Sequence, residues 1–116
     1  MTVLGIDHVQ IAIPRGGEDE ARAFYGGLIG MEELPKPDAL RGRGGCWFRA
    51  GEQELHLGVE EPFVPARRAH PGLVVADLDA IRARLPLYED DANIAGVDRL
   101  FVLDPFGNRL ELRQVV

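Results

Sequence analysis

The chain has 116 residues, of which 46% are hydrophobic and 28% are charged, a composition typical of one soluble globular domain. Nineteen acidic residues against thirteen basic ones give a formal net charge of −6. The sequence has no Lys/Arg run, which excludes a nucleic-acid surface because such surfaces neutralise phosphates. Cys46 is the only cysteine, and no secretory leader or long apolar stretch is present, so we expect a cytoplasmic protein with no membrane association and no internal disulfide.

The first half of the sequence predicts a strand, a helix and a hairpin. Residues 6–13 form a strand-like run, and residues 18–28 carry apolar side chains at helical spacing, with Gly30 as the C-terminal stop. Residues 35–45 are rich in Gly and Pro and show no periodicity, which predicts an exposed, mobile loop that could act as a lid. Residues 47–57 are typical of a hairpin.

The second half repeats this order. A linker over residues 59–69 contains two prolines, and a short strand over residues 70–75 follows. Asp77 is placed to cap the next helix, and residues 100–112 predict a second hairpin. The acidic stretch over residues 88–98 is most simply a solvated loop; a calcium loop is the alternative, but its ligand periodicity is wrong.

The repeat divides one domain, residues 1–116, into a first module over residues 1–58 and a second over residues 70–116. His8 and His70 lie near the start of their modules, and His56 in Leu-His-Leu aligns with Glu111 in Leu-Glu-Leu. Strand alternation places these four side chains on the more polar faces of their strands. A single strand histidine is more often structural or solvated than a ligand, but all three histidines of the chain fall at repeat-equivalent positions.

Three imidazoles and one carboxylate predict a metal centre formed by His8, His56, His70 and Glu111. This donor set suits Fe, Mn, Ni, Co or Zn and contains too much nitrogen for Mg or Ca. Four further side chains are candidates for the substrate pocket by strand parity alone: Gln10, Trp47, Arg99 and Arg113. Trp47 could equally be a core residue, and Arg113 could simply pair with Glu111 or lie in solvent.

Several motifs resemble the vicinal oxygen chelate superfamily, which includes glyoxalases, extradiol dioxygenases, fosfomycin-modifying enzymes and bleomycin-binding proteins. They are Asp7-His8-Val9, Phe24-Tyr25, Leu28-Ile29-Gly30-Met31, Leu55-His56-Leu57, Asp77-Leu78-Asp79-Ala80 and Asp104-Pro105-Phe106-Gly107-Asn108-Arg109-Leu110-Glu111-Leu112. In the last and most specific motif, Pro105 and Gly107 make a tight turn that aims Glu111 inward. The resemblance implies an α+β fold of two tandem βαβββ modules, each forming half of an open barrel around a divalent metal.

The resemblance also implies roles for the predicted ligands. His8, His70 and Glu111 match the two-histidine, one-carboxylate set of the dioxygenase and fosfomycin branches, and Glu111 matches the catalytic base of glyoxalases. His56 takes the fourth position, where glyoxalases commonly have a glutamate. Ala12 and Glu60 stand where glutathione-using glyoxalases carry an arginine and an asparagine, which disfavours glutathione-dependent activity.

These features predict a metal-dependent lyase, isomerase or dioxygenase that uses Lewis-acid chemistry on a small substrate with vicinal oxygens. The alternative is a non-catalytic protein that sequesters an antibiotic, as bleomycin-binding relatives do; a metal that only stabilises a dimer is a third possibility. In many short relatives a second chain completes each barrel. We therefore expect a homodimer in which His8 and His56 of one subunit meet His70 and Glu111 of the other.

Overall fold

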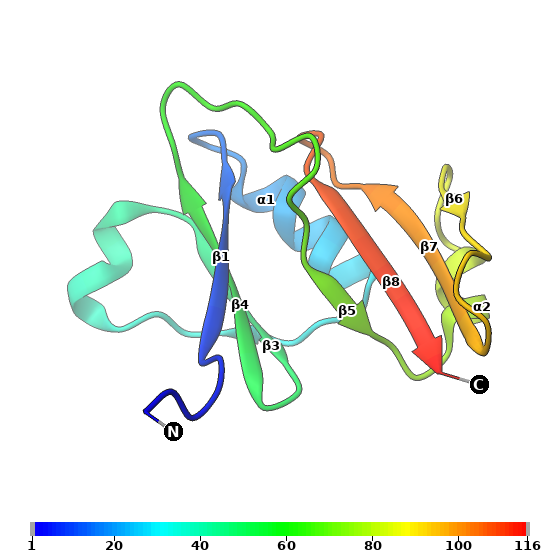
Figure 1. Cartoon of the computed structure of the whole chain (residues 1–116). Helices are drawn as coiled ribbons and strands as arrows, with labels where there is room; N and C mark the ends of the chain where they lie inside the picture. The colour runs from blue at the N-terminus through cyan, green and yellow to red at the C-terminus, as the bar shows by residue number, and fades with distance from the viewer. Residues whose placement is uncertain (1, 116) are drawn as a thin grey trace. The chain divides into compact units, whose positions relative to one another are not determined.

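The structure is a computed structural model that describes residues 2–115. The chain folds as two compact units, Met1–Phe63 and Val64–Val116, and each unit carries one βαβββ module (Figure 1). This confirms the predicted fold class of two tandem βαβββ modules.

Unit 1 contains a four-stranded mixed sheet with one long helical segment and one short one. Its strands lie in the order β1-β4-β3-β2; β1 is parallel to β4, and the other pairs are antiparallel. The elements are β1 (His8–Ile13), α1 (Glu18–Ala21), η1 (Arg22–Leu28), β2 (Glu33–Leu34), η2 (Asp38–Arg43), β3 (Cys46–Ala50) and β4 (Gln53–Val59).

Unit 2 repeats this topology with shorter elements. Its strands lie in the order β5-β8-β7-β6, and β5 is parallel to β8. The elements are β5 (Gly72–Val74), α2 (Leu78–Arg82), β6 (Glu89–Asp90), β7 (Val97–Leu103) and β8 (Arg109–Val115). Both sheets place the first strand of the module at an edge, beside the strand that ends the module.

Both first strands begin later than the sequence pattern predicts. β1 begins at His8, and Ile6 remains 65% exposed. The reason is the register: His8 pairs with Glu54, the second residue of β4, so residues before His8 find little of that strand to pair with. Val9 is exposed too, and of the apolar side chains Val9, Ile11 and Ile13, which alternate along β1, Ile13 alone is fully buried. In unit 2, β5 begins at Gly72, which leaves His70 just before the strand.

The helical segments also differ from the simple prediction. The predicted helix over residues 18–28 forms, but its turns widen from α to π at Arg22. The predicted loop over residues 35–45 contains a 3₁₀ helix, η2, and the Lys36 ammonium donates to the backbone carbonyl of Gly44. This helix buries no side chain, so its sequence shows no apolar periodicity, and an i to i+3 bond from the Leu40 amide to the Pro37 carbonyl closes its first turn.

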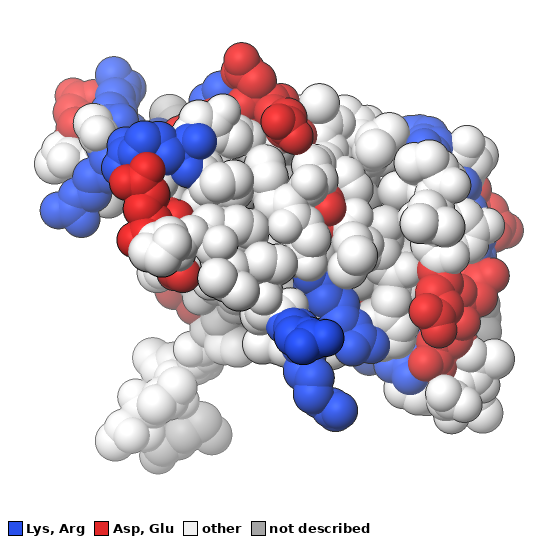
Figure 2. Space-filling view, turned by 90° about the horizontal axis from the view of Figure 1, so that it is seen from above, with Lys and Arg blue, Asp and Glu red and all other residues white. Residues whose placement is uncertain are grey.

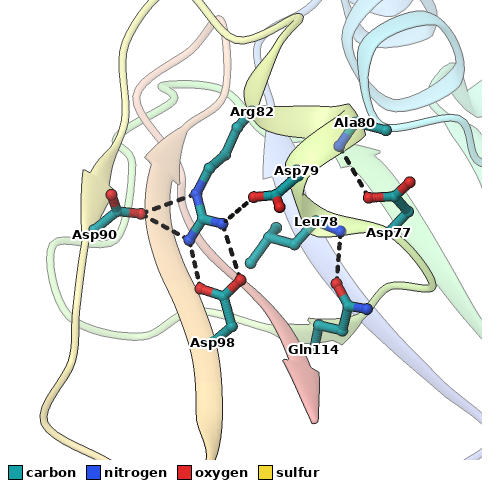
Figure 3. Close-up of polar contacts among 8 residues, drawn as sticks. All are labelled: Asp77, Leu78, Asp79, Ala80, Arg82, Asp90, Asp98 and Gln114. Atoms are coloured by element: carbon teal, nitrogen blue, oxygen red, sulfur yellow. Dashed lines mark hydrogen bonds and ion pairs between the residues drawn. The ribbon is translucent and has the colours of Figure 1, made fainter. Parts of the chain in front are cut away.

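Each sheet buries one face against its own helix. In unit 1 the Tyr25 ring of η1 packs on Phe48 of β3, with ring centroids 5.8 Å apart. In unit 2 the backbone amide of Leu78 in α2 donates to the Gln114 side chain of β8 (2.8 Å; Figure 3). The buried apolar side chains are Ile13, Ala21, Phe24, Tyr25, Ile29, Cys46, Phe48, Leu55 and Leu57 in unit 1, and Leu78, Ile81, Leu85, Leu100, Val102, Leu110 and Leu112 in unit 2.

The acidic stretch over residues 88–98 is not simply a solvated loop. Arg82 of α2 binds Asp90 at 2.9 Å and Asp98 at 2.6 Å, as well as Asp79 in its own helix (Figure 3). Asp77 caps this helix, as predicted, by accepting from the amide of Ala80. The acidic side chains therefore fasten α2 to β6 and β7, which apolar periodicity could not reveal.

The Asp104–Asn108 turn connects β7 to β8 and fixes where β8 begins. The buried Asp104 carboxylate accepts from the backbone amides of Phe106 and Asn108 and from the Asn108 side chain, at 2.8–2.9 Å. Gly107 has φ +92, a left-handed conformation that favours glycine. The predicted tight turn is confirmed, and Asp104 is its main acceptor.

The surface carries charges of both signs. In the view of Figure 2 most acidic and basic side chains gather in mixed groups, with uncharged surface between them. Over residues 2–115, no helix combines the length and apolar character that crossing a bilayer requires.

Candidate metal centre

Three rings form a continuous stack on the sheet of unit 1. Trp47 and His56 face each other across β3 and β4; their ring centroids lie 3.7 Å apart, and the ring planes are nearly parallel, at 1°. The His8 ring lies 4.2 Å from the His56 ring at an angle of 16°. The predicted pocket residue Trp47 therefore supports a predicted ligand instead of joining the core.

The histidines of this stack differ in which nitrogen stays available. His8 uses Nδ1 to contact the Asp7 carboxylate at 2.9 Å, and among residues 2–115 its Nε2 has no hydrogen-bond partner. His56 is only 4% exposed, and its Nε2 contacts the Glu54 carboxylate at 2.9 Å. The Nε2 of His8 is thus the better placed donor in unit 1.

Gln10 is the remaining predicted site residue of unit 1. It pairs with His56 across β1 and β4, and its side chain lies over Gly58, where an added Cβ would come within 2.6 Å of its Nε2. Because Gly58 has no side chain, the Gln10 amide has room to lie over it.

In unit 2 the structure brings His70 and Glu111 together. The imidazole Nε2 of His70 lies 3.9 Å from Oε1 of Glu111, while its Nδ1 donates to the backbone carbonyl of Arg68 at 2.7 Å. Glu111 is only 6% exposed, although it lies on the polar face of β8. Gly72 is its partner across β5 and β8, so the β5 residue opposite Glu111 has no side chain to cover the carboxylate.

Two guanidinium groups hold the carboxylate of Glu111. Arg99 of β7 donates to Oε1 at 2.9 Å, and Nε of Arg113 lies 3.1 Å from Oε2. Arg99 also binds Asp91 through Nε and a terminal nitrogen. Both predicted pocket arginines are therefore neighbours of the predicted base, and Asp91 is bound to it through Arg99.

Phe101 is a site residue that the sequence analysis missed. It pairs with Glu111 across β7 and β8, its ring meets the His70 ring edge-on with centroids 5.4 Å apart, and the Arg109 guanidinium lies 4.2 Å above it. The repeat could have revealed it, because Phe101 stands opposite Glu111 just as Trp47 stands opposite His56.

The registers of the two sheets support the repeat alignment. Gln10 pairs with His56, and Gly72 pairs with Glu111. His8 and His70 each precede the first member of these pairs by two residues, so they occupy equivalent places in their modules. Neither within residues 2–63 nor within residues 64–115 do three or more His, Cys, Asp or Glu side chains gather closely enough to hold a metal.

Comparison with known proteins identifies the family. A glyoxalase family protein from Bacillus anthracis is 51% identical, with 100% of this chain and 98% of that chain covered and a TM-score of 0.94. The chain belongs to the glyoxalase family of the vicinal oxygen chelate superfamily. No family model matches the sequence, and no curated protein matches it.

More distant members of the superfamily share the fold. A genomically encoded fosfomycin resistance protein from Listeria monocytogenes is 11% identical, with 99% and 96% of the two chains covered and a TM-score of 0.77. An antibiotic-binding protein from a Streptomyces species is 22% identical, with 100% and 99% covered and a TM-score of 0.73. At these identities the likeness concerns the fold, and it includes both an antibiotic-binding protein and a resistance protein.

The donors of this glyoxalase family member fit a metal unequally. Two ligands of one ion at about 2.1 Å lie roughly 3 Å apart, so His70 and Glu111 need only a small side-chain adjustment. The Nδ1 of His70 also donates to the backbone carbonyl of Arg68, and a hydrogen bond of this kind orients metal-binding imidazoles. An imidazole binds metal in its ring plane, so the nearly parallel rings of His8 and His56 do not point at a common ion as they stand.

Proposed function

We propose that this glyoxalase family protein is a divalent-metal-dependent enzyme that acts on a small substrate with adjacent oxygens, with lyase, isomerase or dioxygenase chemistry. The observation that carries the proposal is the pairing of His70 and Glu111, whose Nε2 and Oε1 lie 3.9 Å apart. His8 occupies the equivalent of the His70 position and contacts Asp7 through Nδ1, so that within the described range, residues 2–115, its Nε2 has no hydrogen-bond partner.

His8, His70 and Glu111 would hold the metal, and Fe, Mn, Ni, Co and Zn all suit such a nitrogen and oxygen set. When bound, the metal would supply Lewis-acid polarisation of two adjacent substrate oxygens. His56 was predicted as a fourth ligand. Its contact with Glu54 and its place between two rings favour a different role, in which His56 supports the ring of His8.

Glu111 is the proposed base. Its carboxylate is nearly buried, Arg99 donates a hydrogen bond to Oε1, and the Arg113 guanidinium forms an ion pair with Oε2. A carboxylate held in this way can accept a proton from a carbon or hydroxyl placed beside it without first reorganising its surroundings. Trp47 and Phe101, at equivalent positions, would form apolar walls that limit access of water.

The proposal is tested by screening metal-reconstituted protein with catechols, vicinal diols and 2-oxoaldehydes. Turnover should disappear with Glu111→Gln and His70→Ala and should survive in Arg49→Gln, a control on an exposed arginine of β3 that binds Glu32. Turnover that is unaffected by a chelator would contradict metal dependence, and turnover that is unaffected by Glu111→Gln would contradict the role of that carboxylate.

We further propose that the protein is a homodimer in which His8 comes from one subunit and His70 and Glu111 come from the other. Mixing His8→Ala and His70→Ala chains tests this arrangement. Half of the dimers formed would be mixed, and each would have one intact site, so metal content should recover to about a quarter of the wild-type value. No recovery in dimers shown to have exchanged subunits would place all donors in one chain.

Antibiotic sequestration is the second candidate, and the ring stack favours it. Trp47, His56 and His8 form a column of stacked rings, and a planar drug would extend this column by stacking on the ring at one end of it. Under this alternative a planar antibiotic would bind metal-free protein and emerge chemically unchanged, and Trp47→Ala would abolish binding. Metal-dependent turnover in the screen above would decide for the enzyme.

A further inference from the structure

We propose that the face of the unit 2 sheet around Glu111 binds an oxyanion group of the substrate, a carboxylate or a phosphate or phosphonate, through Arg113 and Arg109. This inference rests on the proposed function for the identity of the site. The oxyanion subsite itself consists of side chains of unit 2 and needs no metal.

Strand alternation gathers three guanidinium groups on one face. Arg109, Glu111 and Arg113 alternate along β8, so they point to the same side. The register of β7 places Arg99 opposite Arg113 and Phe101 opposite Glu111. Although the chain as a whole has a net charge of −6, three arginines lie beside its proposed base.

The charges of this cluster do not cancel. Arg99 binds both Asp91 and Glu111, and Arg113 also contacts Glu111. With Arg109, the cluster has three positive charges against the two carboxylates, so 3 − 2 leaves an excess of one. An incoming anion would balance that excess.

Two of the arginines have hydrogen-bond donors that no acceptor within residues 2–115 uses. The Nε of Arg113 is buried and, among residues 2–115, has no hydrogen-bond acceptor, because its 3.1 Å approach to Glu111 is an ion pair without hydrogen-bond alignment. Within that same range, the Arg109 guanidinium has the Phe101 ring as its neighbour and forms no ion pair. A guanidinium fork matches the two oxygens of a carboxylate or phosphate.

Gly72 keeps the space beside the carboxylate open. A Cβ at this position would lie 3.8 Å from Oε2 of Glu111, so a longer side chain would extend over the carboxylate and its arginines. At the equivalent position of unit 1, Gln10 covers its neighbour Gly58. The two modules differ at this place: unit 1 fills it and unit 2 leaves it free for a ligand.

Calorimetric titration of oxalate and of inorganic phosphate into chelator-treated protein tests the inference. The probe that binds with higher affinity identifies the oxyanion class. Arg113→Gln and Arg109→Gln should each weaken binding about five- to tenfold. The matched control Arg84→Gln, on an exposed arginine beyond α2, should leave it unchanged. Glu111→Gln should tighten binding, because it removes the carboxylate that competes for Arg99 and Arg113.

Absence of saturable binding of either probe by wild-type protein would overturn the inference, as would affinities unchanged in both Arg113→Gln and Arg109→Gln. Circular dichroism spectra and melting curves of each variant show whether it is folded. A variant that is not folded is replaced by the corresponding Arg→Lys variant. Lysine keeps the positive charge but lacks the guanidinium fork, so this variant should weaken binding less than the Gln variant. Because the titrations use metal-free protein, their failure is distinguishable from failure of the proposed metal centre.

Discussion

The turn before β8 offers the sharpest test of how the sequence positions Glu111. In Asp104→Ala, three donors lose their acceptor: the amides of Phe106 and Asn108 and the Asn108 side chain. Each buried donor left unsatisfied costs about 1–3 kcal/mol. The two donors of Asn108 are buried and the Phe106 amide is partly buried, so at the lower end the loss is about 2 kcal/mol, a large part of the 5–15 kcal/mol that stabilises a typical domain.

Asp104→Asn refines the same test. Its one carboxamide oxygen can still accept from both backbone amides, so only the bond to the Asn108 side chain is lost, at a cost of about 1–2 kcal/mol. Urea unfolding followed by circular dichroism should therefore rank wild type above Asn and Asn above Ala. Asp38→Ala, a control on a carboxylate that is 90% exposed, should change stability by less than about 0.5 kcal/mol. An Asp104→Ala protein within that margin of wild type would refute the reasoning.

Three more predictions follow from contacts outside the site. Arg82 lowers the pKa of Asp98 by hydrogen bonding. The stability that this pair adds is therefore complete above the unfolded pKa of about 3.9 and is lost as the pH falls through the folded pKa. Arg82→Met should destabilise the protein at pH 6, and its free energy of unfolding in urea should fall less steeply towards acid pH than that of wild type. Burial raises the pKa of Cys46 to about 11, so Ellman's reagent at pH 8 should label it only after unfolding. Gly45→Ala should lower Tm by several degrees, because its Cβ would lie 2.1 Å from the Leu57 carbonyl oxygen at φ +82; an unchanged Tm would contradict that clash.

The fold could be predicted from the sequence because its strands, helices and turns carry local sequence signals. Alternating apolar residues marked both hairpins, Asp77 marked a helix start, and the Asp104–Asn108 motif marked a turn, and each formed as predicted. These signals are local, so they do not depend on where distant parts of the chain lie. Strand ends were harder to predict, because the first pairing residue depends on the register with a strand far along the chain, as Ile6 shows.

The candidate site was predictable in its residues and less so in their contacts. Strand parity could place Arg99 and Arg113 on the face of Glu111, but it could not show that both would contact that carboxylate. Asp91 seemed to belong to a solvated loop because its partner, Arg99, lies on the neighbouring strand. Phe101 was missed because an aromatic residue in a strand pattern is equally typical of a core.

The central claim is that His70 and Glu111 help to hold a catalytic metal, and metal content measured by mass spectrometry tests it most directly. Tag-free wild-type protein, as purified and after reconstitution with each candidate ion, is compared with His70→Ala, Glu111→Ala and His56→Gln. We predict about one Fe, Mn, Ni, Co or Zn per chain in wild type, with loss in the first two variants and retention in His56→Gln. Wild-type protein that holds no metal under any of these conditions would contradict the account.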